Sequence, residues 1–160
     1  MLVFVDTNVL LYASDSSEPV KQPFAHAWLE HLWDQQAGRV SAQVLSEYHT
    51  TACRKLSKLL TPDEAWKEVE AYFAWNPRPI DRDVLTQARE IQSRWKLNWW
   101  DCLIVAAARL QDCTLLLSED LQDGMRFGDL TVRNPFELRV EDAIAAYRPG
   151  RAPRRAARRA

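Results

Sequence analysis

Two short apolar runs, each followed by acidic residues, stand out in the hydropathy pattern of the chain. Residues 2–5 are apolar and include two β-branched valines, and Asp6 follows them directly. Residues 114–117 read Thr-Leu-Leu-Leu, and the segment 118–120 behind them reads Ser-Glu-Asp. Short apolar runs that end in turn-forming residues are typical of buried strands in a parallel sheet. We therefore predict two buried strands with carboxylates at their carboxyl ends.

In most of the chain outside these two runs, apolar residues recur at the spacing of an amphipathic helix. A first helix is predicted from Val9, and further helices at about 21–37, 43–60, 61–73, 83–95 and 99–111, with a terminal helix from about 134. Short strands are predicted at 39–41, 78–80 and 130–132, the last at an edge of the sheet. Strands that alternate with helices favour an α/β fold around a mainly parallel sheet of four to five short strands.

The composition is that of one globular domain without a membrane segment. The chain has 160 residues, of which 47% are hydrophobic and 27% are charged, which suffices for a sizeable core. The longest apolar run, 102–108, is far too short to span a membrane, and the amino terminus lacks the basic segment of a signal peptide. The three cysteines form no CxxC pair and are expected to be reduced core residues. We expect a cytoplasmic protein.

Charge is divided unevenly between the body of the chain and its carboxyl terminus. Six of the 21 basic residues are arginines within 148–160, a segment without acids, so 15 bases face 22 acids in the remainder. The body thus carries a net charge of about −7, unlike a uniformly basic nucleic-acid binder. We predict one domain over 1–148 and a disordered, arginine-rich tail over 149–160, which either contacts RNA phosphates or is merely solvated.

The segment 99–111 combines a buried helix with a carboxylate. Residues 102–108 are all apolar, so the predicted helix is apolar nearly all the way round and must be buried, yet Asp101 lies in its first turn. A buried carboxylate costs several kcal/mol unless it is paired, hydrogen-bonded or bound to a cation. Asn98 offers the structural alternative, because an N-cap with an acid three residues later resembles a capping box.

In a parallel α/β fold these acids meet at one edge of the sheet. Asp6 and Asp120 follow the carboxyl ends of two strands, and Asp101 begins the helix that returns to the second strand. Glu47 reaches the same edge if its helix also starts there. Like charges raise each other's pKa, and an oxygen-only ligand set suits Mg²⁺ or Mn²⁺ rather than Zn²⁺. Such a cation can hold a phosphodiester and activate water, so the pattern predicts metal-dependent phosphodiester cleavage.

Four segments of the chain together resemble the PIN-domain ribonucleases, and within them the VapC-type toxins of bacterial toxin–antitoxin pairs. The segments are Val-Asp-Thr-Asn-Val-Leu at 5–10, Val-Leu-Ser-Glu-Tyr at 44–48, Trp-Trp-Asp-Cys-Leu-Ile-Val-Ala-Ala-Ala at 99–108 and Leu-Ser-Glu-Asp-Leu-Gln-Asp-Gly at 117–124. Each is weak alone, but the four occur in order at family-like spacing, and the resemblance covers roughly residues 2–132.

The resemblance implies a PIN-like α/β/α sandwich over 1–148 and Mg²⁺-dependent endonucleolytic cleavage of RNA, with Mn²⁺ able to substitute. It also implies a homodimer and a cognate antitoxin whose carboxyl-terminal segment enters the site. Asn8 and Ser118 would steady the carboxylates or bind water on the metal, and Glu119 and Asp123 are alternatives to Asp120 as the fourth acid. The residues implied as catalytic and metal-binding are Asp6, Glu47, Asp101 and Asp120.

The tryptophans leave further alternatives open. Trp28 and Trp33 suit a core or a dimer face better than RNA contact, whereas Trp99 and Trp100 flank Asp101, so that one of them could stack on an unpaired base. Adjacent helical residues point about 100° apart, which favours burial of at least one of the two.

Three rival functions remain open at this point. One is a PIN nuclease of RNA processing that is not a toxin, and another is a catalytically silent PIN-like scaffold that binds protein or RNA. The third is a phosphatase with an Asp nucleophile, which usually needs a second acid two residues later, where this chain has Asn8.

Overall fold

A five-stranded sheet forms the centre of the computed structural model, which describes residues 1–146. The predicted tail at 149–160 and the predicted domain boundary at 148 lie outside these residues. The strand order across the sheet is β2-β1-β3-β5-β4. The strands are β1 (Val3–Val5), β2 (Gly38–Arg39), β3 (Leu115–Leu117), β4 (Arg126–Phe127) and β5 (Leu130–Arg133).

Seven α-helices within residues 1–146 surround this sheet, and a short 3-10 helix, η1 (Tyr72–Trp75), continues the fourth. Most begin at a side chain that accepts a hydrogen bond from the first helical turn, as in the complete capping box of Thr61 and Glu64. The helices are α1 (Thr7–Ser14), α2 (Gln22–Asp34), α3 (Ala42–Lys55), α4 (Pro62–Ala71), α5 (Arg82–Arg94), α6 (Trp99–Leu110) and α7 (Val140–Ala146).

The sheet is parallel except at one edge, as the sequence predicts. β1 pairs in parallel with both β2 and β3, β3 pairs in parallel with β5, and only β4 runs antiparallel to β5. Val5 lies opposite Leu117, so the chain leaves β1 and β3 at the same level. Asp6 and Ser118 are therefore neighbours at the carboxyl edge, before any side-chain contact is considered.

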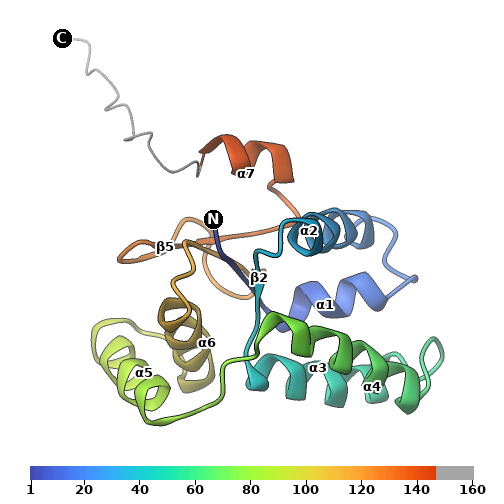
Figure 1. Cartoon of the computed structure of the whole chain (residues 1–160), viewed down its shortest axis with the longest axis horizontal. Coiled ribbons are helices and arrows are strands. Elements are labelled where there is room, and N and C mark those ends of the chain that lie inside the picture. Colours follow the sequence, from blue (N-terminus) through green and yellow to red (C-terminus); the bar gives the residue numbers. More distant parts are fainter. Residues whose placement is uncertain (147–160) are drawn as a thin grey trace.

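Helices cover both faces of the sheet. The connection from β1 to β2 and the one from β2 to β3 cross the sheet in opposite directions. Right-handed crossovers then carry their helices to opposite faces. In Figure 1, α2 and α7 lie together on one side of the strands and α5 packs along α6 on the other. This is the predicted α/β/α sandwich.

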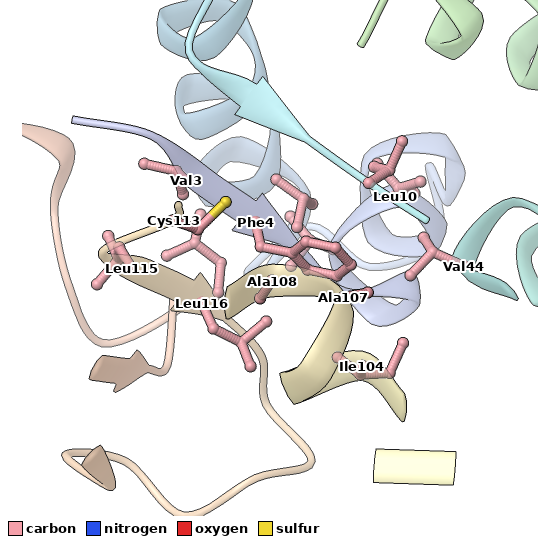
Figure 2. Packing of buried hydrophobic residues seen from close by; sticks show 14 of the residues in the cluster. Val3, Phe4, Leu10, Val44, Ile104, Ala107, Ala108, Cys113, Leu115 and Leu116 are labelled. Carbon is pink, nitrogen blue, oxygen red and sulfur yellow. The ribbon is translucent and has the colours of Figure 1, made fainter. Parts of the chain in front are cut away.

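The core is one continuous cluster between the sheet and these helices. Every residue of β1 and β3 is buried, and so is the whole of 102–108 in α6, as its apolar composition predicts. Figure 2 shows Phe4 and Leu116 from the strands with Ala107 and Ala108 from α6 in this cluster. Because the residues of β1 and β3 are buried on both faces of the sheet, the core holds the carboxyl ends of these two strands in place. None of the helices within residues 1–146 is long and apolar enough to cross a membrane.

Two strand predictions are wrong. The segment 78–80 forms only an isolated bridge between Arg78 and Ser41, because Pro79 has no N–H with which to extend a ladder. The strand predicted at 130–132 is β5, but β4 rather than β5 is the edge of the sheet. Gly128 adopts a positive φ of 67°, which allows a tight hairpin between the two strands.

Helix boundaries also differ from the predicted ones, and three of these differences concern the terminal helix, the helix predicted from 83 and the helix predicted at 43–60. The terminal helix begins at Val140 and not near 134, because the Asn134 side chain instead accepts a hydrogen bond from the Phe136 N–H at 3.0 Å in a turn. The helix predicted from 83 is capped by Asp81, whose carboxylate accepts from the Val84 N–H at 3.0 Å. The helix predicted at 43–60 ends earlier, at Lys55.

Candidate acidic site at the carboxyl edge of the sheet

Asp6 is the most deeply buried carboxylate of the predicted set. Its backbone N–H continues the sheet by donating to the Leu117 carbonyl at 3.0 Å, while its side chain caps α1 by accepting from the Thr7 N–H at 2.7 Å. The second carboxylate oxygen, Oδ2, accepts from the Ser118 hydroxyl at 2.6 Å. The residue is 7% exposed. Backbone register and two short hydrogen bonds therefore fix both its position and its orientation.

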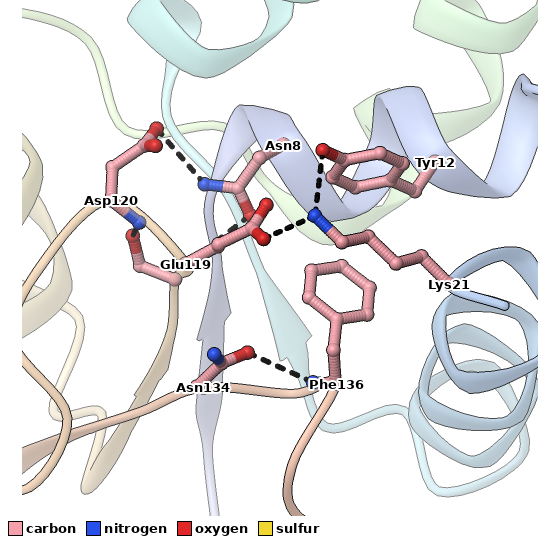
Figure 3. Close-up of polar contacts among 8 residues, drawn as sticks. Asn8, Tyr12, Lys21, Glu119, Asp120, Asn134 and Phe136 are labelled. Carbon is pink, nitrogen blue, oxygen red and sulfur yellow. Dashed lines mark hydrogen bonds and ion pairs between the residues drawn. The ribbon is translucent and has the colours of Figure 1, made fainter. Parts of the chain in front are cut away.

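The loop after β3 brings Asp120 to the same place. Ser118 is fully buried, and its Oγ accepts from the Asp120 N–H at 3.2 Å while its hydroxyl donates to Asp6. The Asn8 amide nitrogen donates to Asp6 at 3.4 Å and to Asp120 at 3.2 Å, as Figure 3 shows for Asp120. Ser118 and Asn8 thus link Asp6, at the end of β1, to Asp120, in the loop after β3.

Glu47 lies in the second turn of α3, the helix that follows β2. Ser41 caps this helix at the carboxyl end of β2, so its first turns lie at the acidic edge. The Glu47 carboxylate accepts from the Thr7 hydroxyl at 3.1 Å and from the Gln43 amide at 2.9 Å. Thr7 is the neighbour of Asp6, so Glu47 is joined to the β1 corner by a side-chain contact.

Asp101 lies in the first turn of α6 and is half-buried. Asn98 caps the helix by accepting from the Asp101 N–H at 2.9 Å, and its amide donates to Asp101 Oδ2 at 2.6 Å. This is the capping arrangement expected as the structural alternative, except that the acid bonds the side chain of the cap and not its backbone. Capping uses one carboxylate oxygen and leaves the other without a hydrogen bond within residues 1–146.

The four carboxylates influence one another electrostatically. Burial raises the pKa of Asp6 to about 6, against the lowering effect of its bonds to Ser118 and Thr7, and the charges of Asp120 and Glu47 add to the rise. Burial also raises the pKa of Asp101, with Asp120 and Glu47 again contributing. Within residues 1–146, no Lys or Arg forms a salt bridge with any of the four. The four carboxylates therefore have no basic salt-bridge partner in the part of the chain that the structure describes.

The acids converge without forming a closed cage. Among residues 1–146, no three Asp, Glu, His or Cys side chains are grouped tightly enough to hold a metal ion. The four segments meet at one edge, and their donors are all carboxylate oxygens. Rotation of the half-exposed side chains would be required to bring the oxygens around one ion.

Comparison with known families identifies this arrangement. The sequence model of the PIN domain matches residues 3–122, which include every acid of the site. The chain belongs to the PIN domain family. Comparison with curated protein sequences finds no significant match.

Solved structures similar to this PIN domain include three from bacteria. A toxin–antitoxin complex from Klebsiella pneumoniae has a TM-score of 0.60 at 19% identity, covering 84% of this chain and 98% of that one. VapBC2 from Rickettsia felis, bound to a DNA fragment from its promoter, has a TM-score of 0.58 at 15% identity with the same coverage. Mycobacterium tuberculosis VapC20, a Sarcin-Ricin loop cleaving toxin, has a TM-score of 0.55 at 19% identity, covering 74% and 91%. At these identities the likeness is one of fold.

The two alternative fourth acids of the PIN domain have partners of their own. Glu119 forms a salt bridge with Lys21, whose ammonium also donates to the Tyr12 hydroxyl at 3.0 Å (Figure 3). Asp123 accepts from Arg133 Nε at 2.9 Å and from the Asn134 N–H at 2.8 Å. Neither contributes to the charge that raises the pKa of Asp6 or Asp101. The geometry thus favours Asp120.

Sequence reasoning missed Thr7, Gln43 and Lys21. Gln43 is a buried polar residue four residues before Glu47, and that i,i+4 spacing was an available signal. Thr7 reads as an ordinary turn residue, and Lys21 is distant in sequence from the residue it pairs with. No local pattern would have found these two contacts.

Proposed function

We propose that this protein is a divalent-metal-dependent endoribonuclease and the toxin of a toxin–antitoxin pair. The observation that carries the nuclease proposal is the convergence of carboxylates from four separate segments on one edge of the sheet. Burial there raises the pKa of Asp6 and of Asp101, with the charges of neighbouring acids adding to the rise, and none of the four carboxylates has a Lys or Arg salt-bridge partner within residues 1–146. Membership of the PIN domain family supports the same class of activity.

The donor chemistry of the site fits a hard divalent cation. Four carboxylates without His or Cys suit Mg²⁺, and Mn²⁺ can replace it in such a set. Burial is the main cause of the raised pKa of Asp6, and the neighbouring Asp120 and Glu47 charges add to it, so a bound cation would favour the ionised form. Asp6, Glu47, Asp101 and Asp120 are the residues that would hold the ion. When bound, it supplies charge to hold the scissile phosphate and makes water a better nucleophile.

The remaining side chains orient these ligands. Ser118 and the Thr7 N–H fix the Asp6 carboxylate, and Asn8 ties it to Asp120. Gln43 holds Glu47 from within α3. Hydrogen bonds to carboxylates of this kind set the direction of their lone pairs, and losing one typically costs about 10- to 100-fold in metal affinity or activity.

The toxin role rests on the likeness in fold to VapC20 and to two toxin–antitoxin complexes. On this proposal the partners are a cognate antitoxin, which restrains the site in the cytoplasm, and a second copy in a homodimer. The rival within the same fold is a nuclease of RNA processing. Induced expression of the chain alone should arrest growth, and Asp6→Asn should not. Normal growth beside retained RNA cleavage would favour the rival.

The nuclease proposal is tested by RNA cleavage with purified protein in Mg²⁺ and in EDTA. We expect cleavage only with the metal, and its loss in Asp6→Asn and Asp101→Asn variants that remain folded. Asp112→Asn is the matched control, because Asp112 is an exposed acid at the opposite end of α6. Its positive φ of 55° is tolerated by Asn as well as by Asp. Cleavage that survives in both site variants would reject the proposal.

A wild type that neither cleaves RNA nor binds Mg²⁺ or Mn²⁺ would favour the alternative of a catalytically silent scaffold. A silent scaffold has no need of four converging acids, so this geometry argues against it. A phosphatase with Asp6 as nucleophile is disfavoured because Asn8 donates to Asp6 and Asp120 and carries no acidic proton.

A further inference from the structure

A groove of about 580 Å³ opens directly beside the acidic site. One wall comes from the first turns of α3, another from the segment before α5, and the third from the start of α6. Glu47 belongs to both the groove and the acidic site, so the two are continuous. The groove is lined chiefly by Gln43, Ser46, Glu47, Pro79, Ile80 and Trp100.

Trp100 is the most exposed aromatic side chain of this wall. It is 60% exposed, whereas its neighbour Trp99 is half-buried against the core. Its backbone is held in place, because the Gln43 amide donates both to the Trp100 backbone carbonyl at 3.3 Å and to Glu47 at 2.9 Å. One buried glutamine therefore links the backbone of Trp100 to an acid of the site.

Trp100 also differs from the other exposed tryptophans. Trp66 contacts the rings of His49 and Phe73, Trp33 contacts those of Tyr72 and Trp75, and Trp95 contacts Phe127. Within residues 1–146, Trp100 has no ring contact of this kind. An exposed indole that lines the same groove as a candidate catalytic acid is available to a flat ligand.

We propose that this groove is a subsite in which an unpaired nucleobase of the RNA stacks on Trp100, next to the phosphate held by the acids. The inference rests on the proposed function. A base is neutral and flat, which suits an apolar groove bordered by negative charge. A base within a duplex is already stacked on both faces, so the subsite would select unpaired nucleotides. The Ser46 hydroxyl, which has no hydrogen bond within residues 1–146, can donate to or accept from the base edge.

The test measures binding of two fluorescent oligonucleotides by anisotropy in Ca²⁺ buffer. One is a ten-nucleotide oligoadenylate, and the other is the same ribose-phosphate chain without bases. The proteins are the wild type, Trp100→Ala, Trp100→Phe and the control Trp66→Ala, whose tryptophan is 46% exposed on α4. We expect Trp100→Ala to weaken oligoadenylate binding by about 5- to 100-fold, as removal of one base–aromatic stack does. Trp100→Phe should recover most of that loss.

The chain without bases should bind the wild type and Trp100→Ala equally, because only the stack distinguishes them. Equal oligoadenylate binding by wild type and Trp100→Ala overturns the subsite, and so does a wild type that binds neither oligonucleotide. A changed apparent mass of Trp100→Ala in size-exclusion chromatography, with unchanged RNA affinity, overturns it in favour of a contact between copies.

Wild-type cleavage, measured alongside, separates this inference from the proposed function. Mg²⁺-dependent cleavage with no effect of Trp100→Ala rejects the subsite alone. Base-dependent binding without any cleavage supports the subsite and counts against the nuclease proposal.

Discussion

Asp6 and Asp101 both lie at the carboxyl edge of the sheet, but the structure holds them in different ways. Asp6 follows a fully buried strand, and its position follows from the register of β1 against β3 and from the Ser118 hydroxyl. Asp101 is half-buried and is held by one asparagine in its own helix turn. Asp6 is thus positioned by the sheet, whereas Asp101 is positioned by a side chain of its own helix start. The two regions should respond differently to substitution.

The largest expected effect is the loss of RNA cleavage in either region. Asp6→Asn and Asp101→Asn should each lower the cleavage rate by about 100-fold or more, because each removes a charge that would hold the cation. The measurement is the initial rate of RNA cleavage at saturating Mg²⁺, with Asp112→Asn as the control. If only Asp6→Asn loses activity, Asp101 is a capping residue and not a ligand.

The next effect concerns which acid of the loop after β3 completes the site. Asp120→Asn should lose about 100-fold in rate, whereas Glu119→Gln and Asp123→Asn should stay within a few-fold, since both those acids are paired with basic residues. The three variants are compared in one cleavage assay at fixed Mg²⁺. A severe loss in Glu119→Gln with an active Asp120→Asn would show that the assignment is wrong.

A third prediction separates the two regions by stability rather than by activity. Burial raises the folded-state pKa of Asp6 to about 6, above the ordinary aspartate value of 3.8. The fold therefore favours the protonated form, whose stabilising contribution is complete below about pH 4 and is lost as the pH rises through 6. Without metal, the free energy of unfolding of Asp6→Asn should exceed that of the wild type by about 2–3 kcal/mol at pH 8. At pH 4 the difference should be less than about 1 kcal/mol.

Urea denaturation in EDTA at the two pH values measures this difference, and Asp112→Asn provides the baseline. A gain that is the same at both pH values would mean that ionisation of Asp6 is not its cause. Because Asp101 is less buried, Asp101→Asn should show a smaller change with pH than Asp6→Asn.

The smallest predicted effects concern the residues that orient the ligands. Ser118→Ala should reduce Mg²⁺ affinity by about 10- to 100-fold, since it removes a short hydrogen bond from the buried Asp6 carboxylate. Gln43→Leu should cost less, about 10-fold, because Glu47 keeps its bond from Thr7. Titration calorimetry ranks the two variants. A larger loss of Mg²⁺ affinity in Gln43→Leu than in Ser118→Ala would show that the Gln43 bond to Glu47 matters more than the Ser118 bond to Asp6.

The sequence allowed the buried strands β1 and β3 to be predicted better than the short strand β4. The strands β1 and β3 are apolar throughout, so their ends, and with them Asp6 and Ser118, could be located from hydropathy alone. Parallel topology then placed both at one edge. The two-residue strand β4 has too few positions to show a pattern, and its hairpin depends on Gly128. Short elements of this kind are set by their neighbours.

Contacts between helices were beyond sequence reasoning. The link from Gln43 to Trp100 depends on how closely α3 approaches α6, and the pairing of Lys21 with Glu119 joins segments 98 positions apart. Neither spacing carries a periodic signal. Capping was predicted well at Thr61 and Asn98, because N-caps depend on only a few consecutive residues.

The central claim is that the four converging carboxylates form one divalent-cation site, and direct titration of Mg²⁺ or Mn²⁺ into the purified protein tests it. The account predicts saturable binding to the wild type and to Asp112→Asn, and binding weakened at least about tenfold in both Asp6→Asn and Asp101→Asn. Equal binding by all four proteins, or none by the wild type, would contradict the claim, because the acids would then meet for a structural reason only.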